Sequence, residues 1–181
     1  GRTSPKQTHV SRLLVDYAAS GARVVRLKSG DPGIFGRLEE EITALRAAAI
    51  DFEIIPGVTT ASAAAAAAMI PLTRRLTARR LQFVTGHDIA GVLPQDLNMA
   101  ALADPQATTG VYMPKHTFPV LAERLFAAGL PQNTPAMLAE NVSRPEQNLL
   151  RDSMQALAKR LERDVSSAPG LILYGSLADA P

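Results

Sequence analysis

Short runs of β-branched and apolar residues alternate, along this chain of 181 residues, with segments whose apolar residues recur every three or four positions. The first pattern predicts strands at residues 23–27, 52–55, 81–85, 109–113, 136–140 and 171–174, and a further extended stretch at 147–151. The second predicts helices at residues 5–20, 38–49, 61–69, 97–103, 118–128 and 154–163. Thr117 and Ser153 are expected to cap the last two helices. Such alternation is typical of an α/β fold.

The pattern breaks once, in a basic and polar stretch at residues 73–80. We interpret this stretch as a link between two lobes, which predicts one domain at residues 1–75 and a second at residues 76–181. Arg74, Arg75, Arg79 and Arg80 are most simply the solvated face of that link. In a cleft between lobes they would also suit a polycarboxylate or RNA.

Composition excludes several classes of site. The chain has no cysteine and only three histidines, so no disulfide, thiolate metal site or histidine-rich metal cage is expected.

The longest uncharged apolar stretch, residues 61–72, is too short to cross a bilayer. No export signal opens the sequence, so we expect a cytoplasmic protein.

The basic residues favour an anionic ligand. The net charge is only +2, but 15 arginines accompany 4 lysines, and the arginine fork binds carboxylates and phosphates in pairs. A general composition bias explains the same excess. The absence of tryptophan and an aromatic content of 4% leave few stacking platforms, which weakens an RNA interpretation.

Polar and glycine-rich loops follow the predicted strands, where α/β proteins bind their ligands. Gly30, Gly33 and Gly36 allow close backbone approach, but their spacing matches neither the dinucleotide fingerprint nor a phosphate-binding loop. Asp31 is suited to accept bonds from ribose hydroxyls or an amine, and equally to a hydrogen bond within its own loop. Thr59 and Thr60 are suited to a ligand or to capping the alanine-rich helix.

Later loops carry two further candidates. His87 and Asp88 resemble half of a base-and-orienter pair, but no serine occupies a sharp-elbow motif, so hydrolysis is disfavoured. Met113 is either core filling or a ligand contact.

Several ordered blocks together resemble the tetrapyrrole methylases, and most closely the members that methylate uroporphyrinogen III. The similarity spans essentially the whole chain. The blocks are Val24 to Pro32 with Ile34 to Arg37, Phe52 to Ser62, Ile70 to Arg75, Phe83 to His87, Tyr112-Met113, Thr134 to Ala136, Glu140-Asn141 and Ser143 to Pro145.

The resemblance implies a two-domain α/β fold in which residues 1–75 are the C-terminal part of the first domain. It also implies S-adenosylmethionine as methyl donor, bound between the two domains, with S-adenosylhomocysteine as its product. The family further implies a homodimer. The expected reaction converts uroporphyrinogen III to precorrin-2 by methylation at C2 and C7, in sirohaem and cobalamin synthesis. Carried over by position, the cofactor contacts are Ser29, Gly30, Asp31, Ile34, Thr59, Thr60, Met113, Val142 and Gly170.

The chain departs from the family pattern at Ser29, Gly33 and Val142, and in the linker at Leu76 and Thr77. Family members also carry further residues before the position of Gly1, including an aspartate and a lysine proposed to transfer protons, so the sequence is expected to be a fragment and no catalytic residue is assigned in it. The alternatives are a later precorrin C-methyltransferase of the same fold, a non-catalytic relic that binds tetrapyrrole or cofactor, and an RNA-binding module.

Overall fold

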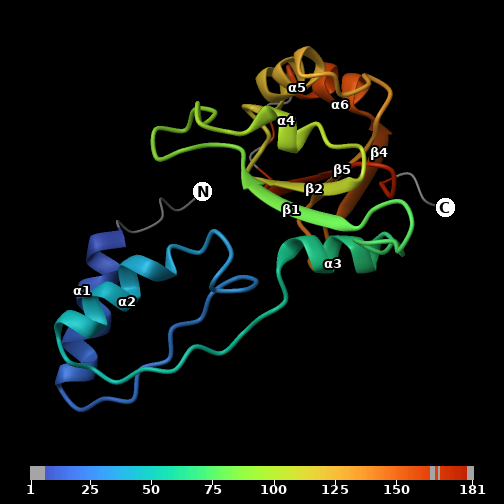
Figure 1. The fold of residues 1–181 in the computed structure, drawn as a ribbon. Helices are drawn as coiled ribbons and strands as arrows, with labels where there is room; N and C mark the ends of the chain where they lie inside the picture. The colour runs from blue at the N-terminus through green and yellow to red at the C-terminus, as the bar shows by residue number, and fades with distance from the viewer. Residues whose placement is uncertain (1–6, 164–165, 167, 179–181) are drawn as a thin grey trace. The chain divides into compact units, whose positions relative to one another are not determined.

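The structure, a computed structural model, describes residues 7–163, 166 and 168–178 (Figure 1). Residues 5 and 6, where the first helix is predicted to begin, lie outside them. The chain divides into two compact units, residues 1–59 and 60–181. The boundary expected after residue 75 stays a prediction. Among the helices described, none combines the length and apolar composition that crossing a bilayer requires.

The second unit is built on one mixed five-stranded sheet of order β1-β2-β5-β3-β4. Strands β1 and β2 are parallel, and the other neighbours are antiparallel. The sequence prediction of these strands is confirmed, including the extended stretch at 147–151, which falls largely within β4. The bounds are β1 (Arg80–Thr85), β2 (Ala107–Tyr112), β3 (Pro135–Glu140), β4 (Asn148–Ser153) and β5 (Gly170–Tyr174).

Helices cover both faces of this sheet (Figure 1). One face carries α4 (Met99–Leu102), α5 (Phe118–Ala127) and α6 (Met154–Leu161), and the other carries α3 (Thr60–Ala67). Large apolar side chains fill the first interface, and Leu121, Leu157 and Ile172 are fully buried there. Because α3 presents only small buried side chains such as Ala61 and Ala64, it approaches β5 closely.

The two predicted helix caps have different outcomes. The Ser153 hydroxyl accepts a hydrogen bond from the Ala156 amide at 3.2 Å, which confirms it as the N-cap of α6. Thr117 precedes α5 but makes no capping bond with its side chain. Its buried hydroxyl donates instead to the carbonyls of Gly86, at 2.5 Å, and Pro114, at 3.2 Å. Thr117 is thus the N-cap residue of α5, as predicted, but its backbone angles, φ −107° and ψ −13°, are not the extended ones with which a capping side chain usually reaches the helix amides.

The first unit contains α1 (Gln7–Ala19) and α2 (Leu38–Ala47), which pack against each other. The strands predicted at 23–27 and 52–55 are not formed: among the described residues neither segment joins a β-ladder. Both segments instead line a cavity of about 680 Å³ together with α1 and α2. The sequence prediction fails because β-propensity takes effect only where a neighbouring strand supplies hydrogen bonds and side-chain contacts.

Candidate functional site

Strand β5 determines which loops of the second unit lie together. It runs antiparallel between β2 and β3, and its register pairs Leu171 with Tyr112 and Gly170 with Glu140. The first residue of β5 therefore lies beside the last residues of both neighbours. The loops that leave β2 and β3 meet the start of β5 at one edge of the sheet.

The chain turns sharply at this edge. Met113 and Asn141, which directly follow β2 and β3, have φ angles of 53° and 49° in the left-handed region. The Asn141 amide donates to the Pro169 carbonyl at 3.0 Å, which fastens the loop after β3 to the segment before β5. The predicted site residues Met113, Val142 and Gly170 are thus brought to one edge, and 42% of Met113 is exposed there.

The start of helix α3 reaches the same edge. The Ala61 amide donates to the Tyr112 hydroxyl at 3.3 Å, and the Tyr112 ring meets Phe83 edge-on with centroids 5.6 Å apart. Thr60, the first residue of α3, is therefore held near the end of β2. Four of the nine predicted cofactor residues gather on this unit.

The other five predicted residues lie in the two loops of the first unit. They are Ser29, Gly30, Asp31 and Ile34 in one loop and Thr59 at the end of the other. Asp31 joins the loops, since its Oδ1 accepts from the Gly33 amide at 2.8 Å and its Oδ2 from the Gly57 amide at 3.0 Å. The structure thus shows the hydrogen bond within the loop that the sequence allowed, while a cofactor contact by Asp31 stays a prediction.

Gly57 has no space for a side chain. A Cβ atom at this position would lie 2.5 Å from the carbonyl oxygen of Gly30. Only glycine allows the two backbones to approach this closely, so Gly57 and Asp31 together determine how the loops fit.

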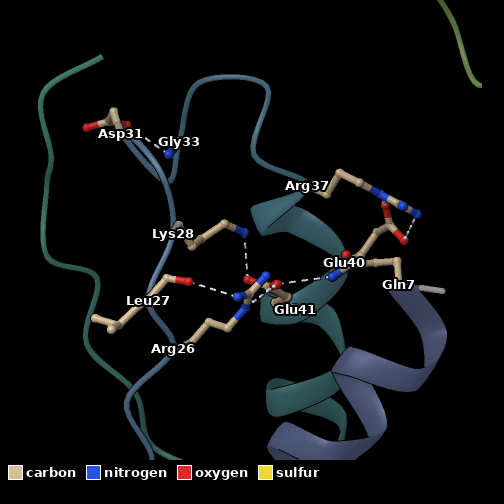
Figure 2. A network of polar contacts seen from close by, with 9 residues as sticks. All are labelled: Gln7, Arg26, Leu27, Lys28, Asp31, Gly33, Arg37, Glu40 and Glu41. Atoms are coloured by element: carbon tan, nitrogen blue, oxygen red, sulfur yellow. Dashed lines mark hydrogen bonds and ion pairs between the residues drawn. The ribbon is translucent and has the colours of Figure 1, made fainter. Parts of the chain in front are cut away.

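A buried carboxylate anchors the first of these loops (Figure 2). Glu41 on α2 is 3% exposed, and its Oε1 accepts from Gln7 Nε2 at 3.1 Å and from Arg26 Nε at 3.2 Å. Its Oε2 accepts from Lys28 Nζ at 2.8 Å. The contacts join α1, α2 and the segment that leads into the loop of Asp31.

The pKa of Glu41 reflects this surrounding. Burial alone would raise the pKa, but the bonds from Lys28, Gln7 and Arg26 outweigh it and hold the pKa below that of an ordinary glutamate. In the sequence, Glu41 is one of three acids in the first turn of α2, where the helix dipole favours negative charge. Its place on the same helical face as Leu38 and Leu45 was the signal that it turns inward.

Two other sequence candidates do not form a site. The imidazole Nδ1 of His87 lies 3.0 Å from the backbone oxygen of Asp88, while the Asp88 carboxylate accepts from the amides of Ala90 and Val92. Asp88 therefore does not orient His87, and the base-and-orienter arrangement is absent among the described residues. In that same part of the chain no group of acidic or histidine side chains could hold a metal ion.

Comparison with known sequences relates the chain to one family. The family model described as Tetrapyrrole (Corrin/Porphyrin) Methylases matches residues 2–158. The chain is 43% identical to siroheme synthase of Azotobacter vinelandii, over 94% of this chain and 36% of that protein. It is 37% identical to uroporphyrinogen-III C-methyltransferase of Synechocystis, over 100% of this chain and 69% of that protein. The chain thus spans about a third of the siroheme synthases that it matches.

Solved structures share the fold. The uroporphyrin-III C-methyl transferase of Thermus thermophilus complexed with S-adenyl homocysteine superimposes with a TM-score of 0.80 and 29% identity, over 95% of this chain and 74% of that one. A cobalt precorrin-4 methyltransferase superimposes with a TM-score of 0.82 at 23% identity, over 96% and 72% of the two chains. The predicted α/β class is confirmed.

The Glu41 network predicts a stability that falls in acid. Because the pKa of Glu41 is lower in the folded chain, its contribution is complete above the unfolded value of about 4.3 and is lost as the pH falls through the folded value. In Glu41→Gln this acid-dependent part is missing, and the free energy of unfolding at pH 7 falls by about 2–3 kcal/mol because Lys28 loses its carboxylate. Urea titrations of the whole chain from about pH 7 to pH 3 measure both effects.

Glu40→Gln is the matched control. Glu40 is the preceding residue of α2 and pairs with Arg37 on the surface, with an Nε to Oε1 distance of 2.7 Å. Removal of such a pair changes stability by at most about 1 kcal/mol. Identical pH profiles for the wild-type chain and Glu41→Gln would contradict the assigned role.

Proposed function

The chain belongs to the tetrapyrrole methylase family, and we propose that it acts in the S-adenosylmethionine-dependent C-methylation of uroporphyrinogen III. The observation that carries the proposal is the convergence of Met113, Val142 and Gly170 at one edge of the sheet. Support comes from the uroporphyrinogen-III C-methyltransferases of Synechocystis and Paracoccus denitrificans, which are 37% and 40% identical to this chain. A structural relative also carries S-adenyl homocysteine.

The loops of the two units suit the cofactor chemically. Each carboxylate oxygen of Asp31 accepts one backbone amide and keeps a second lone pair, which can accept from an amine or a ribose hydroxyl. Gly30 is exposed and has no side chain, so its backbone groups can be approached by polar groups of a nucleoside. We propose that these residues, with Ser29, Ile34, Thr59, Thr60, Met113 and Val142, hold S-adenosylmethionine.

The reaction proposed is a direct methyl transfer. Bound S-adenosylmethionine supplies an electrophilic methyl group on its sulfonium. Transfer of this methyl group to a pyrrole carbon would form a carbon–carbon bond, break the carbon–sulfur bond to release S-adenosylhomocysteine, and end with loss of a proton from the methylated ring. The loops of this chain fix the orientation in which the two carbons meet. Two such transfers, at C2 and C7, give precorrin-2, on the way to sirohaem and cobalamin.

The arginine excess suits the proposed substrate. Uroporphyrinogen III carries eight carboxylates, and the side chains of Arg74, Arg75 and Arg79 are exposed around a turn that backbone bonds between Arg74 and Ala78 close at 2.8 and 3.0 Å. Guanidinium groups bind carboxylates in pairs and with defined geometry. We propose that this turn contributes to holding the propionate and acetate side chains. Assembly as a homodimer and a cytoplasmic location complete the proposal, and sedimentation of the purified chain tests the dimer.

The direct test is an assay of the full-length protein. Incubation with uroporphyrinogen III and S-adenosylmethionine is expected to yield S-adenosylhomocysteine and precorrin-2, identified by absorbance and product mass. Formation of neither product refutes the proposal. Methyl groups on other ring carbons would assign the protein to another branch of the family.

Gly57→Ala predicts a specific loss of cofactor affinity. The added Cβ pushes against the Gly30 carbonyl and separates the two loops that Asp31 joins. We expect the affinity for S-adenosylhomocysteine, measured by calorimetry, to fall about tenfold or more. Gly91→Ala is the control, because a Cβ there meets no atom within 4 Å, while its φ of 79° adds backbone strain that Gly57→Ala does not carry. Equal loss in both variants would show that general destabilisation of the chain, and not the contact between the loops, lowers the affinity.

A further inference from the structure

A buried ion pair crosses the sheet edge that carries the candidate site. The ammonium of Lys115, in the loop after β2, pairs with Oε1 of Glu140, the last residue of β3. The two side chains are only 7% and 16% exposed. Asn148 Nδ2 donates to the other carboxylate oxygen of Glu140 at 3.2 Å.

The pair spans a strand that lies between its partners. Because β5 separates β2 from β3, the Lys115 side chain must cross β5 to reach Glu140. It crosses at Gly170, the register partner of Glu140, where a Cβ would lie 3.3 Å from Lys115 Cε and 3.5 Å from its Cγ. The absence of a side chain at Gly170 is what leaves room for this crossing.

The crossing connects three predicted cofactor residues. Met113 stands two residues before Lys115, Val142 stands two residues after Glu140, and Gly170 lies under the lysine stem. Met113 adopts a left-handed backbone conformation, which persists only where the surrounding contacts hold it. A buried ion pair is weak evidence for added stability, since apolar residues of similar volume often replace it without loss. Its defined geometry is better suited to fixing how the loops are spaced.

We propose that Lys115 and Glu140 are positioning residues, whose ion pair across Gly170 sets the spacing of the loops of Met113 and Val142 and so the affinity for the methyl donor. Neither residue needs to touch the cofactor. The inference rests on the proposed function, because it assumes that the donor binds at this edge.

The decisive variant replaces both partners. Lys115→Leu combined with Glu140→Leu leaves no unpaired buried charge, so the chain is expected to fold with a melting temperature close to that of the wild type. Without the ion pair, the affinity for S-adenosylhomocysteine, measured by calorimetry, is expected to be about tenfold lower than that of the wild type. If the pair only stabilised the fold, the double variant would have both the melting temperature and the affinity of the wild type. Wild-type affinity in the double variant therefore overturns the proposal.

Two further variants keep the test clear if the double variant does not fold. Asn148→Ala removes one bond that β4 donates to Glu140 and is expected to lower the affinity about threefold. An unchanged affinity contradicts the proposal.

Arg80→Met is the control. Arg80 pairs with Asp104 at the start of β1, at the end of the sheet away from the loops of Met113 and Val142. It should leave the affinity unchanged, and a loss equal to that of the double variant would contradict a role specific to Lys115. Failure of the wild-type chain itself to bind would refute the proposed function instead.

Discussion

The antiparallel placement of β5 between β2 and β3 is the constraint on which the candidate site depends. In a purely parallel arrangement the start of a strand lies at the edge opposite to its neighbours' ends. Reversal of β5 brings Gly170 to the edge where β2 and β3 finish, so that segments far apart in the sequence meet. Both faces of β2 and β5 are buried, under α5 and α6 on one side and α3 on the other, so a shift by one residue would exchange side chains between two differently packed interfaces.

The first unit achieves loop order by a different means. Its segments 23–27 and 52–55 join no ladder among the described residues, and polar side chains make the defining contacts instead. Asp31 accepts amides from two loops, and Glu41 receives three donors from α1 and the segment before the loop. Charge-assisted bonds of this kind are directional, so they specify the path of the chain where hydrophobic packing is sparse.

Much of the fold follows from the sequence pattern alone. The helices and strands beyond residue 80 were predicted because their apolar periodicity reflects burial on one face, and that burial is realised in the sheet. The segments at 23–27 and 52–55 have the same composition but no paired neighbour, and composition cannot reveal whether a partner strand is present. Thr117 likewise matched a capping pattern, while the acceptor that it uses, the Gly86 carbonyl, is 31 residues away.

The candidate site was predicted largely through family resemblance, residue by residue. Spacing alone left Asp31 undecided between a ligand and its own loop, and it could not separate His87 and Asp88 from a catalytic pair. No sequence pattern marks Lys115, because its partner Glu140 is 25 positions away along the chain. The side chain reaches this partner only across Gly170, which lies between the two in space. Such contacts depend on strand order, which periodicity does not encode.

We propose that the methyl donor binds where the loops after β2 and β3 meet the start of β5. A crystal structure of the full-length protein with S-adenosylhomocysteine would show whether it does. The ligand is expected to contact Met113 and Gly170. A ligand seated instead in the cavity between α1, α2 and the segments 23–27 and 52–55, without contact to the β5 edge, would contradict it.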